Sequence, residues 1–155
     1  MYVGNYLRTE GTNGVLNFGK PFSERPTRLK GYFKYTSATI DKSNSELAHL
    51  IGQPDTCQIY IALGDWSEPL EIRTKPSDRK IFDKNDPHVI AYAELSSGES
   101  VLEYTPFTLE LEYRATNRIP TYIVVVASAS KYGDFFTGGD GSVLFIDDFS
   151  LEYDY

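Results

Sequence analysis

Apolar and polar positions alternate along most of this chain with the period of two that half-buried β-strands show. The clearest run is Phe107–Tyr113, where apolar residues take every second position and Thr108, Glu110 and Glu112 lie between them. The same alternation predicts strands at Pro26–Ser37, Thr56–Leu63, His88–Leu95 and Val143–Tyr153, and shorter ones at Val15–Phe18 and Pro69–Arg73. Tyr122–Ser130 is apolar at both sets of positions, so we expect it to be a central strand.

Turn-forming residues such as Gly64-Asp65, Asn85-Asp86-Pro87 and Gly138–Gly141 separate these runs. One short helix is expected, because Ser43 and Glu46 form a capping-box pattern and Gly52 can end the helix that follows. Seven or eight strands joined by some long connections favour an all-β fold. The expected architecture is an antiparallel β-sandwich of the jelly-roll type.

The composition limits the classes of partner. With 155 residues and 41% hydrophobic residues, the chain suits a single domain over residues 1–155. The formal net charge of −7 argues against nucleic acid as a partner. No apolar run reaches the roughly 18 residues of a membrane span, so direct membrane insertion is not expected. The single Cys57 excludes an internal disulfide.

Two adjacent aspartates interrupt the last apolar run, in Phe145-Ile-Asp-Asp-Phe149. Unbroken alternation would point Asp147 towards the core and Asp148 towards the opposite face. A buried carboxylate needs a cation, an arginine or several N–H donors. The functional interpretation of Asp147 is a calcium ligand, completed by carbonyls from other loops. The alternative is an aspartate near the strand end that accepts backbone N–H groups in a turn.

Aromatic residues in loops and on strand faces are the candidates for ligand binding. Exposed rings beside acids and amides are how proteins hold sugars, because a ring faces C–H groups while polar groups bind hydroxyls. Phenylalanines in the 131–141 loop can instead plug one end of the sandwich, and the tryptophan can be a lid over the core. The candidate carbohydrate-binding residues are Trp66, Tyr132, Asp134 and Phe135, with Tyr92 and Tyr32 behind them.

Catalytic patterns are few. Glu110 and Glu112 share one face, and two carboxylates can cleave glycosides, although such rows are commonly a solvated strand face. His49 and His88 stand alone, without the spacing of a zinc site. Serine-nucleophile, cysteine-nucleophile and P-loop signatures are absent from the sequence.

Several of these segments resemble the putative carbohydrate metabolism domain (PCMD) family. The resemblance is carried, in order, by Gly19–Tyr35, Asp55–Trp66, Val89–Leu95 and Tyr122–Tyr153. It implies a jelly-roll sandwich similar to carbohydrate-binding modules and to galactose-binding-like domains. The ending Leu144–Leu151 (LFIDDFSL) is similar to the last strand of several such modules, in many of which the strand's aspartate helps to hold a structural calcium ion.

The resemblance also implies where the domain lies in its full-length protein and in the cell. In such proteins the domain usually ends a longer chain that carries immunoglobulin-like domains and a lipoprotein signal. This chain would then be the C-terminal domain of an extracellular or cell-surface protein, anchored to the outer membrane through its N-terminal region. The resemblance supplies no catalytic residues.

Three functions follow as hypotheses. The first is a non-catalytic carbohydrate-binding domain, or an accessory domain of a glycan-handling surface protein, with a glycan or oligosaccharide as partner. The second is a glycoside hydrolase that uses surface carboxylates. The third is a structural domain that contacts a neighbouring domain of the same chain.

Overall fold

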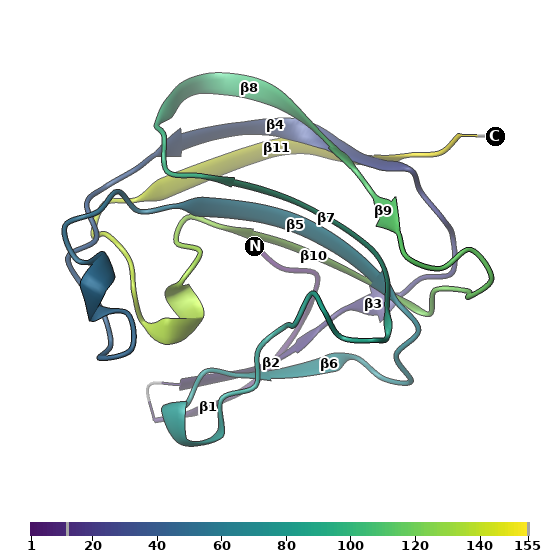
Figure 1. Ribbon diagram of the computed structural model, residues 1–155, viewed down its shortest axis with the longest axis horizontal. Helices are drawn as coiled ribbons and strands as arrows, with labels where there is room; N and C mark the ends of the chain where they lie inside the picture. The colour runs from purple at the N-terminus through teal and green to yellow at the C-terminus, as the bar shows by residue number, and fades with distance from the viewer. Residues whose placement is uncertain (12, 155) are drawn as a thin grey trace.

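The computed structural model describes residues 1–11 and 13–154, and the strands there form three antiparallel sheets (Figure 1). The central sheet contains, in order, β3 (Lys20–Pro21), β10 (Tyr122–Ser128), β5 (Cys57–Gly64), β7 (Val89–Ser97) and β9 (Glu112–Tyr113). The outer sheet contains β11 (Val143–Glu152), β4 (Arg28–Thr36) and β8 (Val101–Glu110). The small sheet contains β1 (Gly4–Glu10), β2 (Asn13–Phe18) and β6 (Leu70–Arg73).

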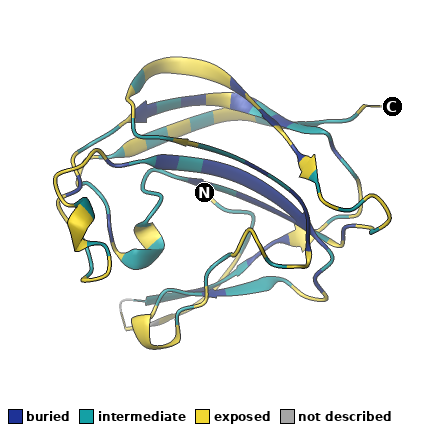
Figure 2. Cartoon of the chain, in the orientation of Figure 1, coloured by how far each residue is buried: buried dark blue, intermediate teal, exposed yellow. Residues whose placement is uncertain are grey.

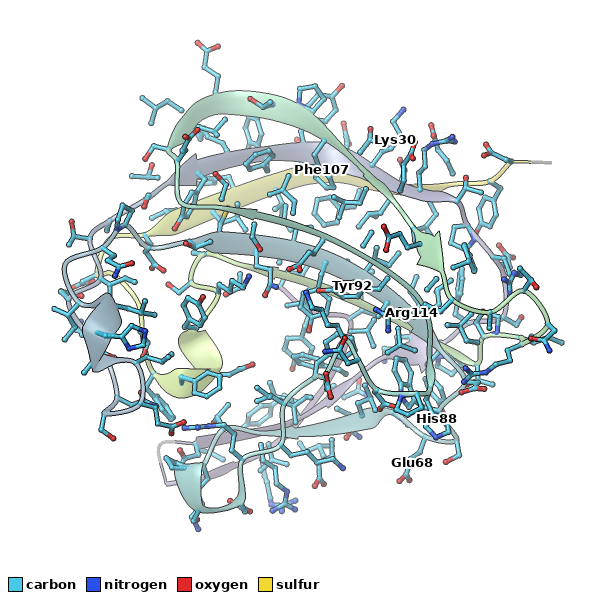
Figure 3. The ribbon with its side chains drawn as sticks, viewed as in Figure 1. Lys30, Glu68, His88, Tyr92, Phe107 and Arg114 are labelled. Carbon is cyan, nitrogen blue, oxygen red and sulfur yellow. The ribbon has the colours of Figure 1, made fainter. Side chains whose placement is uncertain are left out.

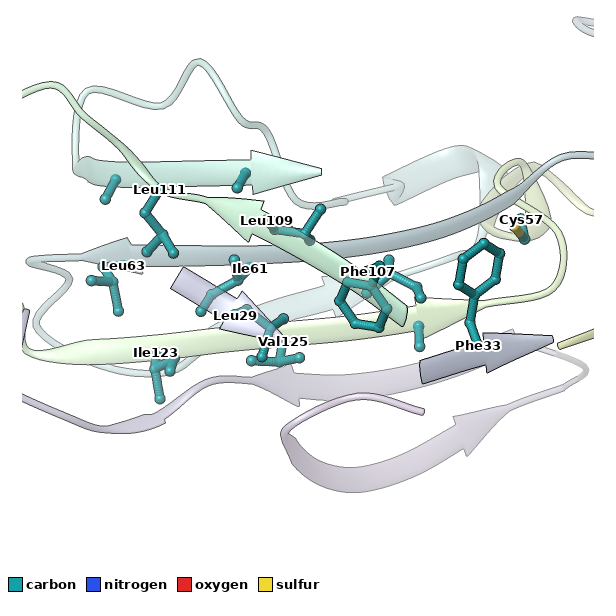
Figure 4. Packing of buried hydrophobic residues seen from close by; sticks show 14 of the residues in the cluster. Leu29, Phe33, Cys57, Ile61, Leu63, Phe107, Leu109, Leu111, Ile123 and Val125 are labelled. Carbon is teal, nitrogen blue, oxygen red and sulfur yellow. The ribbon is translucent and has the colours of Figure 1, made fainter. Parts of the chain in front are cut away.

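The main core lies between the central and outer sheets, as the predicted β-sandwich requires (Figure 4). β4 shows the expected alternation, with Leu29, Phe33 and Tyr35 buried and the intervening side chains less covered. These side chains meet apolar residues of β5, β8 and β10. The alternating pattern therefore correctly predicted both the fold class and the face of β4 that is buried.

The small sheet covers the other face of the central sheet with a second core. This core contains Phe18 and Ile72 from the small sheet, and Tyr60 and Val124 from the central sheet. β5 and β10 are consequently buried on both faces, and β5 is almost continuously buried in Figure 2. The expectation for Tyr122–Ser130 is confirmed, whereas β5, which alternates in sequence, carries buried residues on both sides.

The predicted strand Phe107–Tyr113 is two strands, because the chain changes sheets within it. β8 begins earlier, at Val101, and pairs with β4 as far as Glu110. β9 then pairs with β7, placing Glu112 opposite Tyr92. At the break, the Leu111 N–H donates to the Thr27 carbonyl.

The predicted helix between Ser43 and Gly52 does not form. Only Ala48–Leu50 (η1) makes a 3-10 turn, and two further 3-10 turns lie at Pro76–Asp78 (η2) and Gly133–Phe135 (η3). The Ile40 N–H donates to the Gln53 carbonyl and the Gly52 N–H donates to the Ile40 carbonyl, which pairs the two ends of the segment, and the Ser43 hydroxyl donates to the Asn44 carbonyl instead of capping a helix. In the described part of the chain, no helix is long and apolar enough to cross a membrane.

A bulge in β11 overturns the predicted orientation of Asp147. Asp147 pairs with Tyr32 and Ser150 pairs with Lys30, so Asp148 and Phe149 together lie opposite Gly31. Asp148 adopts a left-handed φ of 50°. Asp147 lies before the bulge and shares the exposed face of Val143 and Phe145, whereas the extra residue turns Phe149 into the core, so Asp147 and Phe149 do not lie on one face.

Gly31 makes room for the residue that the bulge turns inward. A Cβ at this position would lie 2.5 Å from Cδ1 of Phe149 and 3.0 Å from the Asp147 carbonyl oxygen. Phe149 thereby packs edge-to-face on Phe107, with ring centroids 5.2 Å apart. The bulge and the glycine together allow β11 to complete the core with Leu144 and Ile146 before the bulge and Phe149 after it.

Candidate functional site

A groove with aromatic walls opens on the face of the central sheet that is turned towards the small sheet. Its volume is about 230 Å³. The segment before β7 and the loop after β10 form its sides. It is lined by Gln58, Tyr60, Ile81, Phe82, Lys84, Tyr92, Glu94, Lys131, Tyr132, Asp134 and Phe135. We call this the aromatic groove.

Three rings form a packed cluster at its base and wall. Phe82 stacks on Tyr60, with centroids 5.0 Å apart, and on Tyr92, with centroids 6.1 Å apart. Tyr60 is buried, whereas Phe82 and Tyr92 remain partly exposed. Tyr92 projects from β7 beside Arg114, whose guanidinium carbon lies 6.0 Å from the ring centroid (Figure 3). Because the rings hold one another, their exposed faces are fixed before any ligand binds.

The polar groups of the groove centre on Glu94. Its carboxylate accepts hydrogen bonds from Gln58 Nε2 at 2.8 Å and Lys84 Nζ at 2.9 Å, and Lys131 Nζ lies 4.0 Å away. Partial burial works to raise the pKa of Glu94, but these hydrogen bonds and the charge of Lys131 outweigh it and lower the pKa. Glu94 is therefore an ionised acceptor.

Asp134 has the opposite environment. Burial raises the pKa of its carboxyl, and the nearby Arg79 charge only partly opposes this effect. Arg79 lies over the ring of Phe135, 4.3 Å from its centroid. The groove thus combines one carboxyl group whose pKa is lowered with a second whose pKa is raised.

Asp55 anchors the loop that carries Tyr132, Asp134 and Phe135. It is 0% exposed, and its Oδ2 accepts hydrogen bonds from Ser130 Oγ at 2.6 Å and from the Gly139 N–H at 2.9 Å. Ser130 and Gly139 lie on either side of η3, so one carboxylate ties both ends of the loop to the start of β5. The loop that supplies four of the eleven lining residues of the groove is therefore held by a buried carboxyl group.

A second depression of about 420 Å³ adjoins the groove around β7. It shares Lys84, Tyr92 and Glu94 with the aromatic groove and is also lined by Ala93, Thr108, Leu109, Glu110, Glu112 and Arg114. Glu110 and Glu112 line this depression and both remain exposed, with 78% of the Glu110 side chain accessible. Arg28 Nε lies 3.5 Å from Glu110 Oε1.

Four of the predicted binding residues lie together in the aromatic groove: Tyr92, Tyr132, Asp134 and Phe135. The prediction of a solvent-facing platform is wrong for Trp66, which is 6% exposed and belongs to the second core. Tyr32 is 44% exposed but lies on the outer sheet, opposite Pro106 and Asp147. Sequence reasoning missed Phe82, since no strand pattern includes it.

Asp147 does not have the buried setting that suggested calcium. It is exposed, and its Oδ1 accepts the N–H of Asp148 at 2.9 Å, as in the alternative turn interpretation. Among the described residues, no group of three or more His, Cys, Asp and Glu side chains is arranged to hold a metal ion. The calcium role of Asp147 stays a prediction.

Metal removal checks that prediction. A structural ion stabilises the folded state by mass action, so EDTA should lower the melting temperature if Asp147 holds calcium, and added calcium should restore it. An EDTA-treated protein that melts at the same temperature as the untreated protein would contradict the role.

Comparison with known proteins gives a family and a fold. A family model described as "Putative carbohydrate metabolism domain" matches residues 1–152. No curated protein matches the chain. A putative glycoside hydrolase from Bacteroides thetaiotaomicron VPI-5482 is similar at 25% identity over 92% of this chain, with a TM-score of 0.69. A putative glycoside hydrolase from Bacteroides vulgatus ATCC 8482 is similar at 22% identity over 90% of this chain, with a TM-score of 0.63. The matches span 47% and 63% of those two chains.

Proposed function

We propose that this chain, which belongs to the putative carbohydrate metabolism domain family, is a non-catalytic domain that binds carbohydrate in the aromatic groove. One observation carries the proposal: partly exposed rings and hydrogen-bonding side chains from separate segments converge on one groove. Such a combination of apolar walls with a few fixed polar groups is typical of small-molecule sites. The family supports a carbohydrate as the ligand.

The side chains of the groove would bind different parts of a sugar. The ring of Tyr92, held by Phe82, would stack on the C–H face of a sugar. Glu94 would accept hydrogen bonds from hydroxyls, and Lys131 would donate to others. Gln58 and Lys84 already orient Glu94, so little conformational entropy is lost on binding.

Replacement of Tyr92 by alanine should weaken carbohydrate binding about tenfold or more, because it removes the stacking surface. Affinity gel electrophoresis against soluble polysaccharides, followed by titration calorimetry, measures the change. Tyr32→Ala is the matched control: it also removes a partly exposed tyrosine from a strand, but from the outer sheet, and should bind as the wild type does. Equal affinity of both variants, or binding to no carbohydrate by the wild type, would contradict the proposal.

A second candidate function is glycoside hydrolysis. The observation in its favour is the pairing of Asp134, whose pKa is raised, with Glu94, whose pKa is lowered, in one groove. Glycosidases need one carboxylic acid that keeps its proton and one carboxylate that does not. The two similar solved structures are each described as a putative glycoside hydrolase, which adds weight to this candidate.

A reducing-end assay separates hydrolysis from binding. If the domain is a hydrolase, Asp134→Asn should reduce the release of reducing ends by about 100-fold or more while the polysaccharide still binds. Glu103→Gln is the control, since Glu103 is exposed on β8 and lines neither the aromatic groove nor the depression beside it. A wild-type protein that binds a polysaccharide and releases no reducing ends from it would exclude this candidate.

A further inference from the structure

The aromatic groove is small for a complete carbohydrate site. Its volume of about 230 Å³ lies below the range of about 300–1,000 Å³ that is usual for small-molecule sites. The adjoining depression of about 420 Å³ shares Lys84, Tyr92 and Glu94 with it, so the two hollows meet at these three residues. A ligand that stacks on Tyr92 therefore has room to extend towards Thr108 and Glu112.

The charges along this path favour an uncharged ligand. The adjoining depression contains three carboxylates, Glu94, Glu110 and Glu112, and two cations, Lys84 and Arg114. The ammonium of Lys84 lies 2.9 Å from Glu94, and Arg114 donates to the Lys84 carbonyl and lies near the Tyr92 ring. The carboxylates therefore outnumber the cations along this path, and the charge of Lys84 is already paired with Glu94.

Glu112 is exposed on β9, opposite Tyr92, and is not part of the Lys84–Glu94 ion pair. A uronate or sulfate group placed beside Glu112 would meet like charge, and the surplus of carboxylates over cations disfavours acidic glycans. A neutral sugar has hydroxyl groups that can donate to the carboxylates and accept from Arg114. The path thus suits a row of neutral sugars.

We infer that the site takes a neutral oligosaccharide of at least two sugars, which runs from the aromatic groove over Tyr92 into the depression beside Thr108 and Glu112. This inference rests on the proposed carbohydrate-binding function. It adds the length of the ligand and its charge class, neither of which follows from the aromatic groove alone.

The test is a length series measured by titration calorimetry. The neutral probes are monosaccharides to hexasaccharides from cellulose, xylan, mannan and starch, and the acidic probes are oligogalacturonates and hyaluronan fragments of the same lengths. In the bound neutral series, affinity should rise about tenfold or more from one sugar to three. Thr108→Trp, a change on the exposed face of β8 that fills the depression, should abolish this rise and leave binding of the monosaccharide unchanged.

Charge is tested in the same series. Glu112→Lys should increase the affinity for oligogalacturonates at least threefold, because it replaces a repelling group with an attracting one. Equal affinity for all lengths, or wild-type preference for the acidic probes, would overturn the inference while carbohydrate binding itself stands. If neither the wild type nor Tyr92→Ala binds any of the probes, the proposed function is wrong and the inference is wrong with it.

Discussion

Replacement of Asp55 by alanine should lower the free energy of unfolding by about 3–5 kcal/mol. The reason is the loss of one acceptor for three donors: Ser130 Oγ and the Gly139 N–H bind its Oδ2, and the Thr56 N–H binds its Oδ1 at 2.8 Å. Each buried donor left without a partner costs about 1–3 kcal/mol. Urea unfolding followed by far-UV circular dichroism measures the difference.

Two variants sharpen this experiment. Asp140→Ala removes an exposed aspartate from the same loop, whose ion pair with Lys42 at 3.5 Å is solvent-screened, and should change stability by no more than about 0.5 kcal/mol. Asp55→Asn keeps one carbonyl oxygen but turns an N–H₂ donor towards other donors, so its loss should be intermediate. An Asp55→Ala variant as stable as Asp140→Ala would show that the carboxylate does not hold the loop.

The strands could be predicted because their signal is local. A period-two pattern records which residues of a strand meet a core, and it correctly located β4, β5, β7 and β11, while the continuous apolar run located β10. No such pattern marks β1, because Tyr6 and Leu7 are both exposed and β1 is held by its pairing with β2. The pattern also located β2 and β6, but it does not record which strands pair, so it did not predict that they form a separate sheet.

The error at Asp147 has a specific cause. A pattern with period two assumes that no residue is inserted into the strand, whereas Asp148 adds one by adopting a left-handed conformation. From that point the inward and outward sets exchange. Gly31, on the partner strand, was the available signal, because a glycine within a strand often marks a bulge or a close approach.

Only part of the aromatic groove could be predicted from the sequence. Tyr132, Asp134 and Phe135 form a recognisable polar and aromatic loop, and they do line the groove. Phe82 and Lys84 come from an irregular segment whose position depends on tertiary packing, so no local pattern predicts them. Trp66 was predicted to lie at the rim of the sandwich, because it follows the end of a strand. In the structure its ring lies against Gly64 and is buried.

Replacement of Trp66 by alanine should lower the free energy of unfolding by about 3–5 kcal/mol, the usual cost of emptying a large aromatic site in a core. The ring covers Gly64, where a Cβ would lie 2.4 Å from it, and meets Phe82 edge-on with centroids 6.5 Å apart. Its Nε1 also donates to Asp86 at 3.3 Å. Urea unfolding measures the loss, and Trp66→Phe, which refills most of the volume, should recover part of it.

The same residue offers a direct check of burial in the wild-type protein, because it is the only tryptophan in the sequence. Its fluorescence should be quenched weakly by acrylamide in the folded protein and strongly after unfolding in urea, since the quencher must reach the ring. Carbohydrate added to the folded protein should leave this weak quenching unchanged, because the aromatic groove is not lined by Trp66. Strong quenching in the folded state would mean that the ring faces solvent, and Trp66 would return as a candidate stacking platform.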